Sequence, residues 1–378
     1  MDLSLSETQV QIKNSATEFL QAELPKERVL QIDESPTGFD TELWRKMCDL
    51  GWPGIFIPEQ YGGAGLSVTD MGVLLETLGY FASSSPILDS AVLSAQAILE
   101  LGNDAQKKAL LPAIASGQQI VSFAFTEPEY GWGPSFIKLQ TTGTRGDLVL
   151  NGTKLFIPWA HVADHILVAA RTRSGHTPEE GVSLLLVDRK AQGVSTRLMQ
   201  GWIGDKVCEV NFKNVHVPAA SVVGPAGGAW PGIERAMDKA TAVLSGYMAG
   251  GAWKVYEMCR DYSQQRIAFG MPIGTFQHVQ QHVIDAVTAA DSCKWTTYEA
   301  LWMLETNKPE AQIGVSTAKA VASDGYYQAC DHSHDVHGGI GIDLTFGLTH
   351  YTKRARTLQH YLGDARYHKA RIARLMAL

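Results

Sequence analysis

The spacing of apolar residues divides this 378-residue chain into three parts. In residues 1–120, as in "VTDMGVLLETLGYFASSS", apolar side chains recur three and four positions apart, which predicts helices. Residues 121–228 contain short runs such as "HILVAART", "VSLLLVDR" and "EVNFKNVHV" between turn residues, which predict strands. The helical period returns in residues 229–378, with long helices expected at 231–264, 275–304, 310–337 and 364–377. We therefore predict an α+β fold: an N-terminal helical domain, a central small β domain and a C-terminal helical domain of the four-helix type.

Cap and turn residues refine the expected ends of these elements. Ser4 with Glu7 is predicted to form a capping box at the start of the first helix. Asn151-Gly152 stands between two short β-rich runs, which predicts a hairpin turn at that point.

Composition and charge narrow the possible partners and compartments. The chain is 45% hydrophobic and 19% charged, as an ordinary globular protein is, and its net charge of −7 argues against nucleic acid as a partner. The N-terminus lacks the apolar core of a signal peptide, and no run of 18 apolar residues predicts a membrane span. The five cysteines are scattered, odd in number and form no CxxC pair, which favours a reducing compartment. We expect a cytoplasmic protein.

Most familiar catalytic signatures are missing from the sequence. It contains no GxGxxG after a strand, no Walker loop and no GxSxG. "CDHSHDVHGG" places four potential metal ligands close together: Cys330, His332, His334 and His337. On a helix His334 and His337 share a face while His332 points away, so this run cannot close a tetrahedron and we expect no metal site. The glycine pair that follows is instead expected to end the helix.

Two segments could hold a ligand. In "RIAFGMPIGTFQ", Arg266 ends a long predicted helix before a Gly-Pro turn, where a guanidinium could clamp a phosphate. A surface arginine beside a core phenylalanine explains the same segment equally well. In "FAFTEPEYGWGPS", residues 126–128 precede a glycine-containing loop whose backbone could approach a flat or phosphorylated ligand.

The order of five motifs supplies what no single one does. "TEP" comes first, then "KLFIPWA", "RIAFGMPIGTFQ", "HGGIG" and "YLGDARYHKARIA", spread over essentially the full length. In this order the chain resembles the acyl-CoA dehydrogenase family of FAD flavoproteins. The resemblance implies two helical domains around a β domain, an acyl-CoA substrate, a homo- or heterotetramer, and an electron-transfer flavoprotein or similar acceptor.

The resemblance also implies contacts for the flavin ring. Thr126 matches the threonine that bonds the ring edge, with the backbone of Phe123 and Phe125 beside it. Phe156 matches an aromatic residue that stacks on the ring. The family threonine whose hydroxyl approaches flavin N5 is replaced here by Pro158.

Other positions match residues that hold the nucleotide half of FAD across a subunit interface in the family. They are Arg266, Phe269, Gln277, Asp335 in place of a glutamine, and the backbone-approach pair Gly338 and Gly339. On the substrate side, Asp238 matches an aspartate that contacts the CoA arm. Trp132 replaces a serine that meets cofactor and thioester.

The catalytic base of the family is missing from both of its usual positions. The family reaction removes an α-proton to a carboxylate and moves a β-hydrogen as hydride to the flavin, next to a polarised thioester carbonyl. The usual glutamate lies in a C-terminal segment matched here by "YLGD", where Leu362 takes its place before Gly363. The less common position, on the long helix after the β domain, is Ala240.

Three hypotheses follow from the missing base. In the first, another carboxylate acts: Asp89 lies on the predicted helix that in this family lines the acyl pocket, although it could equally cap that helix. In the second, the chain is one subunit of a heteromer whose partner supplies the base and half of the flavin site. In the third, flavin is lost and the fold only binds acyl-CoA or assembles. The first two make the chain an acyl-CoA dehydrogenase or a subunit of one, and the small residues of "SGYMAGGA" hint at a branched or cyclic acyl group unless they serve helix packing.

Overall fold

The computed structural model describes residues 4–144, 146–201 and 206–378. Its contacts form two compact units, each described here by itself. The helical unit comprises Met1–Ser35, Ser67–Ser84 and Thr241–Leu378, and the β unit comprises Pro36–Leu66 and Ser85–Ala240. Helices, then strands, then helices follow one another along the chain, which confirms the predicted α+β fold. The boundaries near residues 120 and 228 stay predictions.

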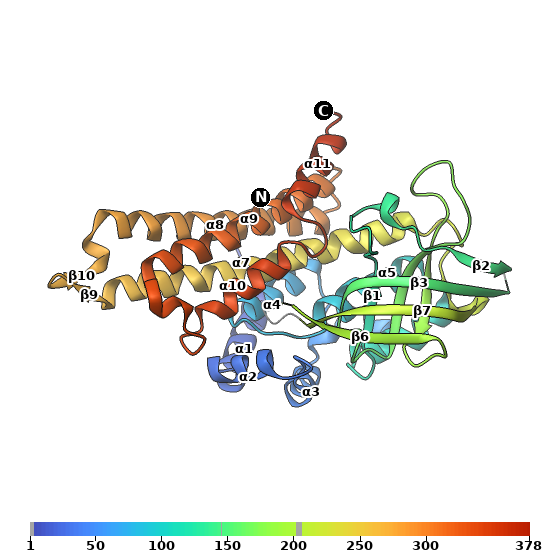
Figure 1. The fold of residues 1–378 in the computed structure, drawn as a ribbon, viewed down its shortest axis with the longest axis horizontal. Helices are drawn as coiled ribbons and strands as arrows, with labels where there is room; N and C mark the ends of the chain where they lie inside the picture. Colours follow the sequence, from blue (N-terminus) through green and yellow to red (C-terminus); the bar gives the residue numbers. More distant parts are fainter. Residues whose placement is uncertain (1–3, 145, 202–205) are drawn as a thin grey trace. The chain divides into compact units, whose positions relative to one another are not determined.

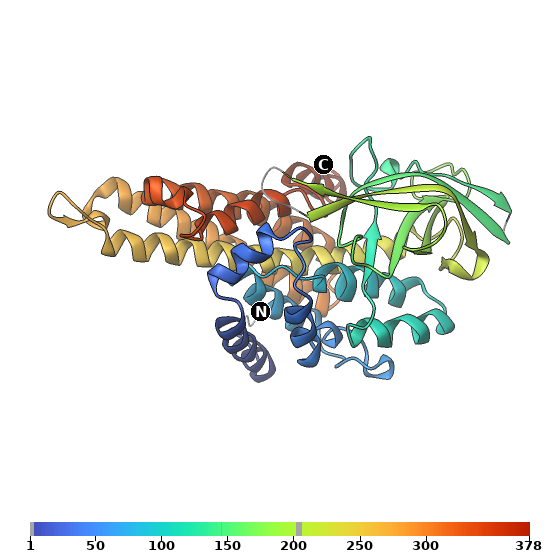
Figure 2. The ribbon, with the colours of Figure 1, turned by 60° about the horizontal axis from the view of Figure 1, so that its bottom comes forward.

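Long helices dominate the helical unit (Figure 1). Its elements are α1 (Glu7–Glu23), α2 (Lys26–Glu34), α4 (Val68–Tyr80), the larger part of α7 (Trp230–Gln265), β9 (Ile267–Ala268), β10 (Met271–Pro272), η6 (Ile273–Thr275), α8 (Gln277–Glu305), α9 (Ala311–His337), η7 (Gly338–Ile342), α10 (Leu348–Leu358) and α11 (Ala365–Leu375). Helices α8 and α9 lie side by side along most of their length in both views (Figure 1 and Figure 2). The helices predicted at 231–264, 275–304, 310–337 and 364–377 are confirmed to within a few residues.

Glycines let the helices of this unit approach closely. A Cβ at Gly79 would lie 1.8 Å from the Tyr247 carbonyl oxygen, and one at Gly250 would lie 1.8 Å from the Glu76 carbonyl oxygen. The space that a Cβ at Gly251 would take is similarly filled by the ring of Tyr326. The small residues of 245–252 therefore serve helix packing, as one of the two sequence interpretations proposed.

The β unit combines short helices with two four-stranded sheets. Its helical elements are α3 (Thr41–Asp49), η1 (Trp52–Gly54), η2 (Glu59–Tyr61), the π-helix η3 (Ile87–Ser94), α5 (Ala95–Leu101), α6 (Asp104–Ala115), η4 (Pro134–Phe136), η5 (Ala219–Ser221) and the first part of α7. Its strands are β1 (Val121–Ala124), β2 (Thr141–Thr144), β3 (Asp147–Pro158), β4 (His165–Arg171), β5 (Val182–Asp188), β6 (Val194–Gln200), β7 (Lys206–Pro218) and β8 (Val222–Val223). One sheet has the order β1-β4-β5-β8, with β1 and β4 parallel, and the other has the order β2-β3-β7-β6.

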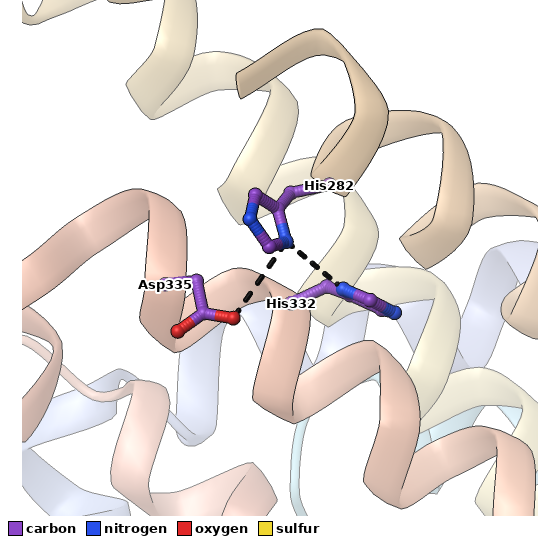
Figure 3. Close-up of side chains that lie close together, drawn as sticks. All are labelled: His282, His332 and Asp335. Atoms are coloured by element: carbon purple, nitrogen blue, oxygen red, sulfur yellow. Dashed lines mark hydrogen bonds and ion pairs between the residues drawn. The ribbon is translucent and has the colours of Figure 1, made fainter. Parts of the chain in front are cut away.

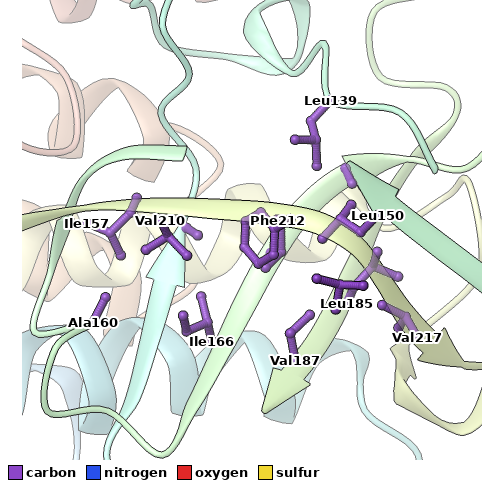
Figure 4. Close-up of a cluster of buried hydrophobic side chains, with 14 of the residues drawn as sticks. Leu139, Leu150, Ile157, Ala160, Ile166, Leu185, Val187, Val210, Phe212 and Val217 are labelled. Atoms are coloured by element: carbon purple, nitrogen blue, oxygen red, sulfur yellow. The ribbon is translucent and has the colours of Figure 1, made fainter. Parts of the chain in front are cut away.

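The two sheets enclose one apolar core (Figure 4). Strand β7 buries every second side chain there, at Cys208, Val210 and Phe212. This alternation is expected of a strand with one face on the core. Strand β4 is buried at every interior position, and β1 beside it packs against η3, so this sheet is covered on both faces.

Two local predictions were wrong. The first capping box is formed by Ser6 and Gln9, not by Ser4 and Glu7. Asn151-Gly152 does not turn a hairpin but lies inside β3, where the pairing with β7 shifts register in a β-bulge. In the part of the chain that is described, no helix combines the length and apolar character needed to cross a membrane.

Candidate functional site

The loop 359–364, which carries Leu362, is held by a buried lysine of α9. The Lys319 ammonium is fully buried and donates to the carbonyl oxygens of Gly363 at 2.9 Å and Leu358 at 3.0 Å, as well as to the Ser323 hydroxyl at 2.8 Å. Gln359 O lies at 3.2 Å from the same nitrogen. Burial lowers the pKa of Lys319 to about 7, against nearby carboxylates that raise it. The lysine therefore satisfies loop carbonyls that would otherwise be buried without a donor.

A buried histidine fixes Leu362 itself. His368 Nε2 lies 3.0 Å from the Leu362 carbonyl oxygen, and because a carbonyl only accepts, this nitrogen carries the proton. The other ring nitrogen is buried without a partner among the described residues. Burial, helped by Lys319, lowers the pKa of His368 to about 3, so the ring is neutral. Leu362 is held at φ +57° with its side chain 3% exposed. The position assigned to the base by the resemblance thus holds a buried apolar side chain, as Ala240 does at 0% exposure.

The hairpin between α7 and α8 is accessible to solvent, in contrast to the buried Leu362 of that loop. Arg266 is exposed, and its guanidinium pairs with no described residue. Phe269 is 93% exposed at φ +52° and contacts only the edge of the Phe276 ring among the aromatic side chains described, with centroids 6.1 Å apart. Arg266 is thus a surface arginine, as the alternative expected, but the phenylalanine near it is not in the core.

The other positions matched to the nucleotide half of FAD are also accessible. Gln277 is exposed at the first residue of α8, and Asp335 is exposed near the end of α9. Gly338 ends α9 at φ +60°, as expected, and a Cβ at Gly338 or Gly339 would meet no atom within 4 Å. The backbone of this glycine pair is thus free for close approach by a ligand.

In the β unit, the Thr-Glu-Pro segment is held by a buried ion pair that sequence reasoning missed. Lys154 is fully buried and its ammonium donates to Glu127 Oε1 at 2.8 Å and to the Phe125 carbonyl oxygen at 2.8 Å. Glu127 also accepts from the backbone N–H groups of Lys138 and Leu139, at 3.0 Å to its nearer oxygen in each case. Burial lowers the pKa of Lys154 to about 8 although Glu127 raises it. This network fixes the loop that follows Thr126.

The aromatic residues matched to the flavin ring lie around that loop. Phe123, Phe125 and Thr126 are buried in or just after β1, and the Trp132 ring stacks on Phe125 at 5.6 Å and 8°. Phe156 is 45% exposed and held at φ +56°. An exposed aromatic ring in the left-handed region is a costly arrangement that marks a candidate contact surface.

The remaining positions on the β unit are partly or fully buried. Pro158 ends β3, and its carbonyl oxygen accepts from the Ser122 hydroxyl at 2.9 Å. Asp238 lies on α7 at 5% exposure. Asp89 is 4% exposed inside the π-helix η3, after Pro86 at the N-cap, so the alternative that Asp89 caps a helix is wrong. A buried carboxylate in a π-helical segment is a candidate functional group.

Models of three acyl-CoA dehydrogenase domains match consecutive parts of the sequence. The N-terminal domain matches residues 6–118, the middle domain residues 122–215 and the C-terminal domain residues 229–377. The chain belongs to the acyl-CoA dehydrogenase family. Its fold is that of an FAD-dependent oxidoreductase, and the order of its domains agrees with the sequence prediction.

Individual acyl-CoA dehydrogenase relatives cover most or all of the chain. Mitochondrial isovaleryl-CoA dehydrogenase of Pongo abelii is 32% identical over 78% of this chain and 71% of its own. The structure of the ChsE4-ChsE5 complex from Mycobacterium tuberculosis contains a chain that is 27% identical with a TM-score of 0.90, covering 100% of this chain and 99% of that one. The FAD complex of PigA is 25% identical with a TM-score of 0.93 and full coverage of both chains.

Proposed function

We propose that this chain is one subunit of a heteromeric, FAD-dependent acyl-CoA dehydrogenase. It would bind the nucleotide half of FAD, and its partner chain would supply the catalytic base. The observation that carries the proposal is the contrast between an open hairpin, with Arg266 and Phe269 exposed, and a closed loop, with buried Leu362 at the base position. A leucine side chain accepts no proton. The chain can therefore contribute to binding where it cannot contribute to proton removal.

The residues of the helical unit fit the nucleotide half of FAD. A guanidinium without an internal partner suits a pyrophosphate, because it forms two parallel charge-assisted hydrogen bonds. The backbone at Gly338 and Gly339 is open to a ligand, and Phe269 offers an uncovered ring. FAD, when bound, supplies the hydride acceptor. Arg266 and the glycine pair would hold and orient it.

The flavin-ring side of the β unit departs further from the family pattern. Trp132 stacks on Phe125, and Pro158 offers no hydroxyl where the family has a threonine. Retained nucleotide-side residues and altered ring-side residues are the combination expected if the two halves of one FAD site come from different chains. The ChsE4-ChsE5 complex from Mycobacterium tuberculosis, which contains a chain similar to this one, supports this interpretation.

The substrate would be a CoA thioester with a branched or cyclic acyl group, and the acceptor an electron-transfer flavoprotein or similar protein. Isovaleryl-CoA dehydrogenase, whose name states a branched acyl group, supports the first part. Asp238 would contact the CoA arm. A panel of straight-chain, branched, aromatic and alicyclic CoA thioesters would identify the acyl class.

The proposal predicts activity only in a complex. The chain purified alone is expected to lack turnover of CoA thioesters with an artificial electron acceptor. Co-purified with an acyl-CoA dehydrogenase-like chain from a neighbouring gene that carries the base glutamate, it should gain turnover and one FAD for every two chains. Full activity of the chain alone contradicts the heteromer. Loss of that activity in Asp89→Asn, with flavin retained, would then assign the base to Asp89.

Arg266→Ala tests, within that complex, whether Arg266 binds the nucleotide half of FAD. Because a hydrogen bond to a charged group contributes about 1.5–3 kcal/mol, we expect FAD affinity to fall by roughly 10- to 100-fold. The matched control is Arg45→Ala, which removes an exposed guanidinium whose partner Asp49 is also exposed. Equal FAD affinity in Arg266→Ala and the control would show that Arg266 does not bind FAD.

A further inference from the structure

Two histidines and an aspartate converge on neighbouring turns of α8 and α9 (Figure 3). His282 Nδ1 lies 3.0 Å from His332 Nδ1 and 3.6 Å from Asp335 Oδ2. The three potential ligand atoms all lie within 4.8 Å of one another. This cluster lies wholly in the helical unit, and the proposed function assigns no role to His282 or His332.

The helix hairpin explains the convergence. His332 and Asp335 are three residues apart on α9, which places them on one face. His282 lies near the start of α8, and the antiparallel pairing of α8 with α9 brings it opposite the end of α9. The local run of histidines does not converge: His334 Nε2 bonds the Thr352 hydroxyl at 2.8 Å, and His337 Nδ1 bonds the Ser333 carbonyl oxygen at 2.7 Å.

The distances suit a divalent transition metal. Zn–N bonds of about 2.0–2.1 Å in a tetrahedron place ligand atoms roughly 3.3 Å apart. Two of the three separations, 3.0 and 3.6 Å, bracket that value, and the third, between His332 and Asp335, lies within 4.8 Å. Two imidazoles with one carboxylate form a ligand set for Zn²⁺, Ni²⁺ or Cu²⁺, whereas Mg²⁺ and Ca²⁺ prefer oxygen ligands.

A second carboxylate occupies the place of an orienting group. Asp285 Oδ2 lies 4.0 Å from His332 Nε2, the ring nitrogen that would not bind the metal, which is longer than a hydrogen bond but places the carboxylate on that side of the ring. Metal-binding histidines commonly direct their other N–H to a carboxylate, which fixes the tautomer and raises ligand basicity. A simple His282–His332 hydrogen bond would account for the shortest distance but gives no reason for two carboxylates to face the same pair.

We propose that His282, His332 and Asp335 bind one divalent transition-metal ion, with Asp285 positioning His332 and the fourth coordination position open to water. Such an ion would join the start of α8 to the end of α9. Residues 330–339 alone gave no reason to expect a metal site, because His282 lies 50 residues before His332. Asp335 is also the position matched to an FAD-contacting glutamine, so the flavin content of each sample should be measured.

Titration of the full-length protein with ZnCl₂ tests the site directly. After dialysis against a chelator, calorimetry should show one equivalent of Zn²⁺ bound, and the thermal midpoint should rise on binding. His282→Ala should abolish this binding, and Asp285→Asn should weaken it by about 10- to 100-fold. With Cu²⁺, electron paramagnetic resonance should show coupling to two nitrogens in the wild type and to none in His282→Ala.

A histidine on the same helix provides the control. His334→Ala removes an imidazole that bonds Thr352 on α10 and should leave Zn²⁺ affinity unchanged. Circular dichroism verifies that each variant is folded. Absence of binding in the wild type, binding retained in His282→Ala, or equal loss in His334→Ala and His282→Ala would overturn the proposal.

Discussion

The loop 359–364 and the α7–α8 hairpin belong to the same helical unit but have opposite characters. Leu362 and Gly363 of the loop are buried, and His368 on α11 and Lys319 on α9 bond their backbone carbonyls, yet the side chain at Leu362 is apolar. The hairpin has no buried residue, and Arg266 at its start has no ion-pair partner among the described residues. One segment is stabilised from within, and the other is available to another molecule.

This difference separates structure from chemistry within one family fold. The loop keeps a costly conformation, with Leu362 at φ +57°, although leucine cannot act as a base there. The bonds from Lys319 and His368 do not depend on the side chain at position 362, because both go to backbone carbonyls. The bonds that hold the loop therefore place no demand on which side chain occupies position 362. The hairpin depends on its side chains for any role.

Replacing the buried lysine is expected to have the largest effect on stability. Lys319→Met keeps the length of the side chain but leaves several buried carbonyl oxygens without a donor, so the free energy of unfolding should fall by about 3 kcal/mol. Lys369→Met is the control, since Lys369 forms an exposed pair with Asp324 and should change stability by less than about 1 kcal/mol. Urea unfolding at one protein concentration measures both. Equal, small changes would mean that the loop is not held by Lys319.

The histidine that holds Leu362 predicts a dependence of stability on pH. The pKa of His368 is about 3 in the folded protein, while an unfolded histidine titrates near 6.5. Between these values the unfolded chain binds more protons, so stability falls as pH falls below about 6.5. Between pH 7 and pH 5 this group alone should remove about 2 kcal/mol.

A variant isolates that contribution from the titration of other groups. His368→Leu should be less stable at pH 7 but should lose less stability than the wild type between pH 7 and pH 5. His176→Ala, which replaces an exposed histidine in a loop, should keep the wild-type pH slope. An unchanged slope in His368→Leu would show that the folded ring is not held neutral.

Periodicity predicted the long helices because each keeps an apolar stripe over many turns. Helix α10 was missed because its sequence, "LTHYTKRARTL", is dominated by polar and basic residues and buries few side chains. The capping box was misplaced because Ser4 with Glu7 and Ser6 with Gln9 both satisfy the pattern, and only the second pair bonds in the structure. Asn151-Gly152 was assigned to a hairpin because a bulge within a long strand requires the same residue types.

The residues of the candidate site also differ in whether the sequence could reveal them. Arg266 could be selected from the sequence because a charged residue at a helix junction has a local signal. Lys319, His368 and Lys154 had none, since each acts on backbone or carboxylate groups that are distant along the chain or hidden in an ordinary apolar pattern. His282 was missed for a related reason: its partners come from another helix. Burial of a lone basic residue becomes informative only when the fold places its acceptors around it.

The smallest expected effect on stability is at the tip of the hairpin. Phe269→Asn removes a ring that is 93% exposed, and asparagine tolerates the left-handed backbone at φ +52°. The free energy of unfolding should therefore change by no more than about 0.5 kcal/mol. If the hairpin forms a contact with a partner chain or its FAD, the same change should lower the fraction of assembled, flavin-loaded complex, measured by size-exclusion chromatography with flavin absorbance. Ile284→Gln on α8 is the control, because Ile284 is 55% exposed but lies outside the hairpin. A loss of assembly confined to Phe269→Asn would show that exposure at this tip serves binding, whereas an unchanged complex in both variants would leave the hairpin as ordinary surface and remove the contrast with the buried loop.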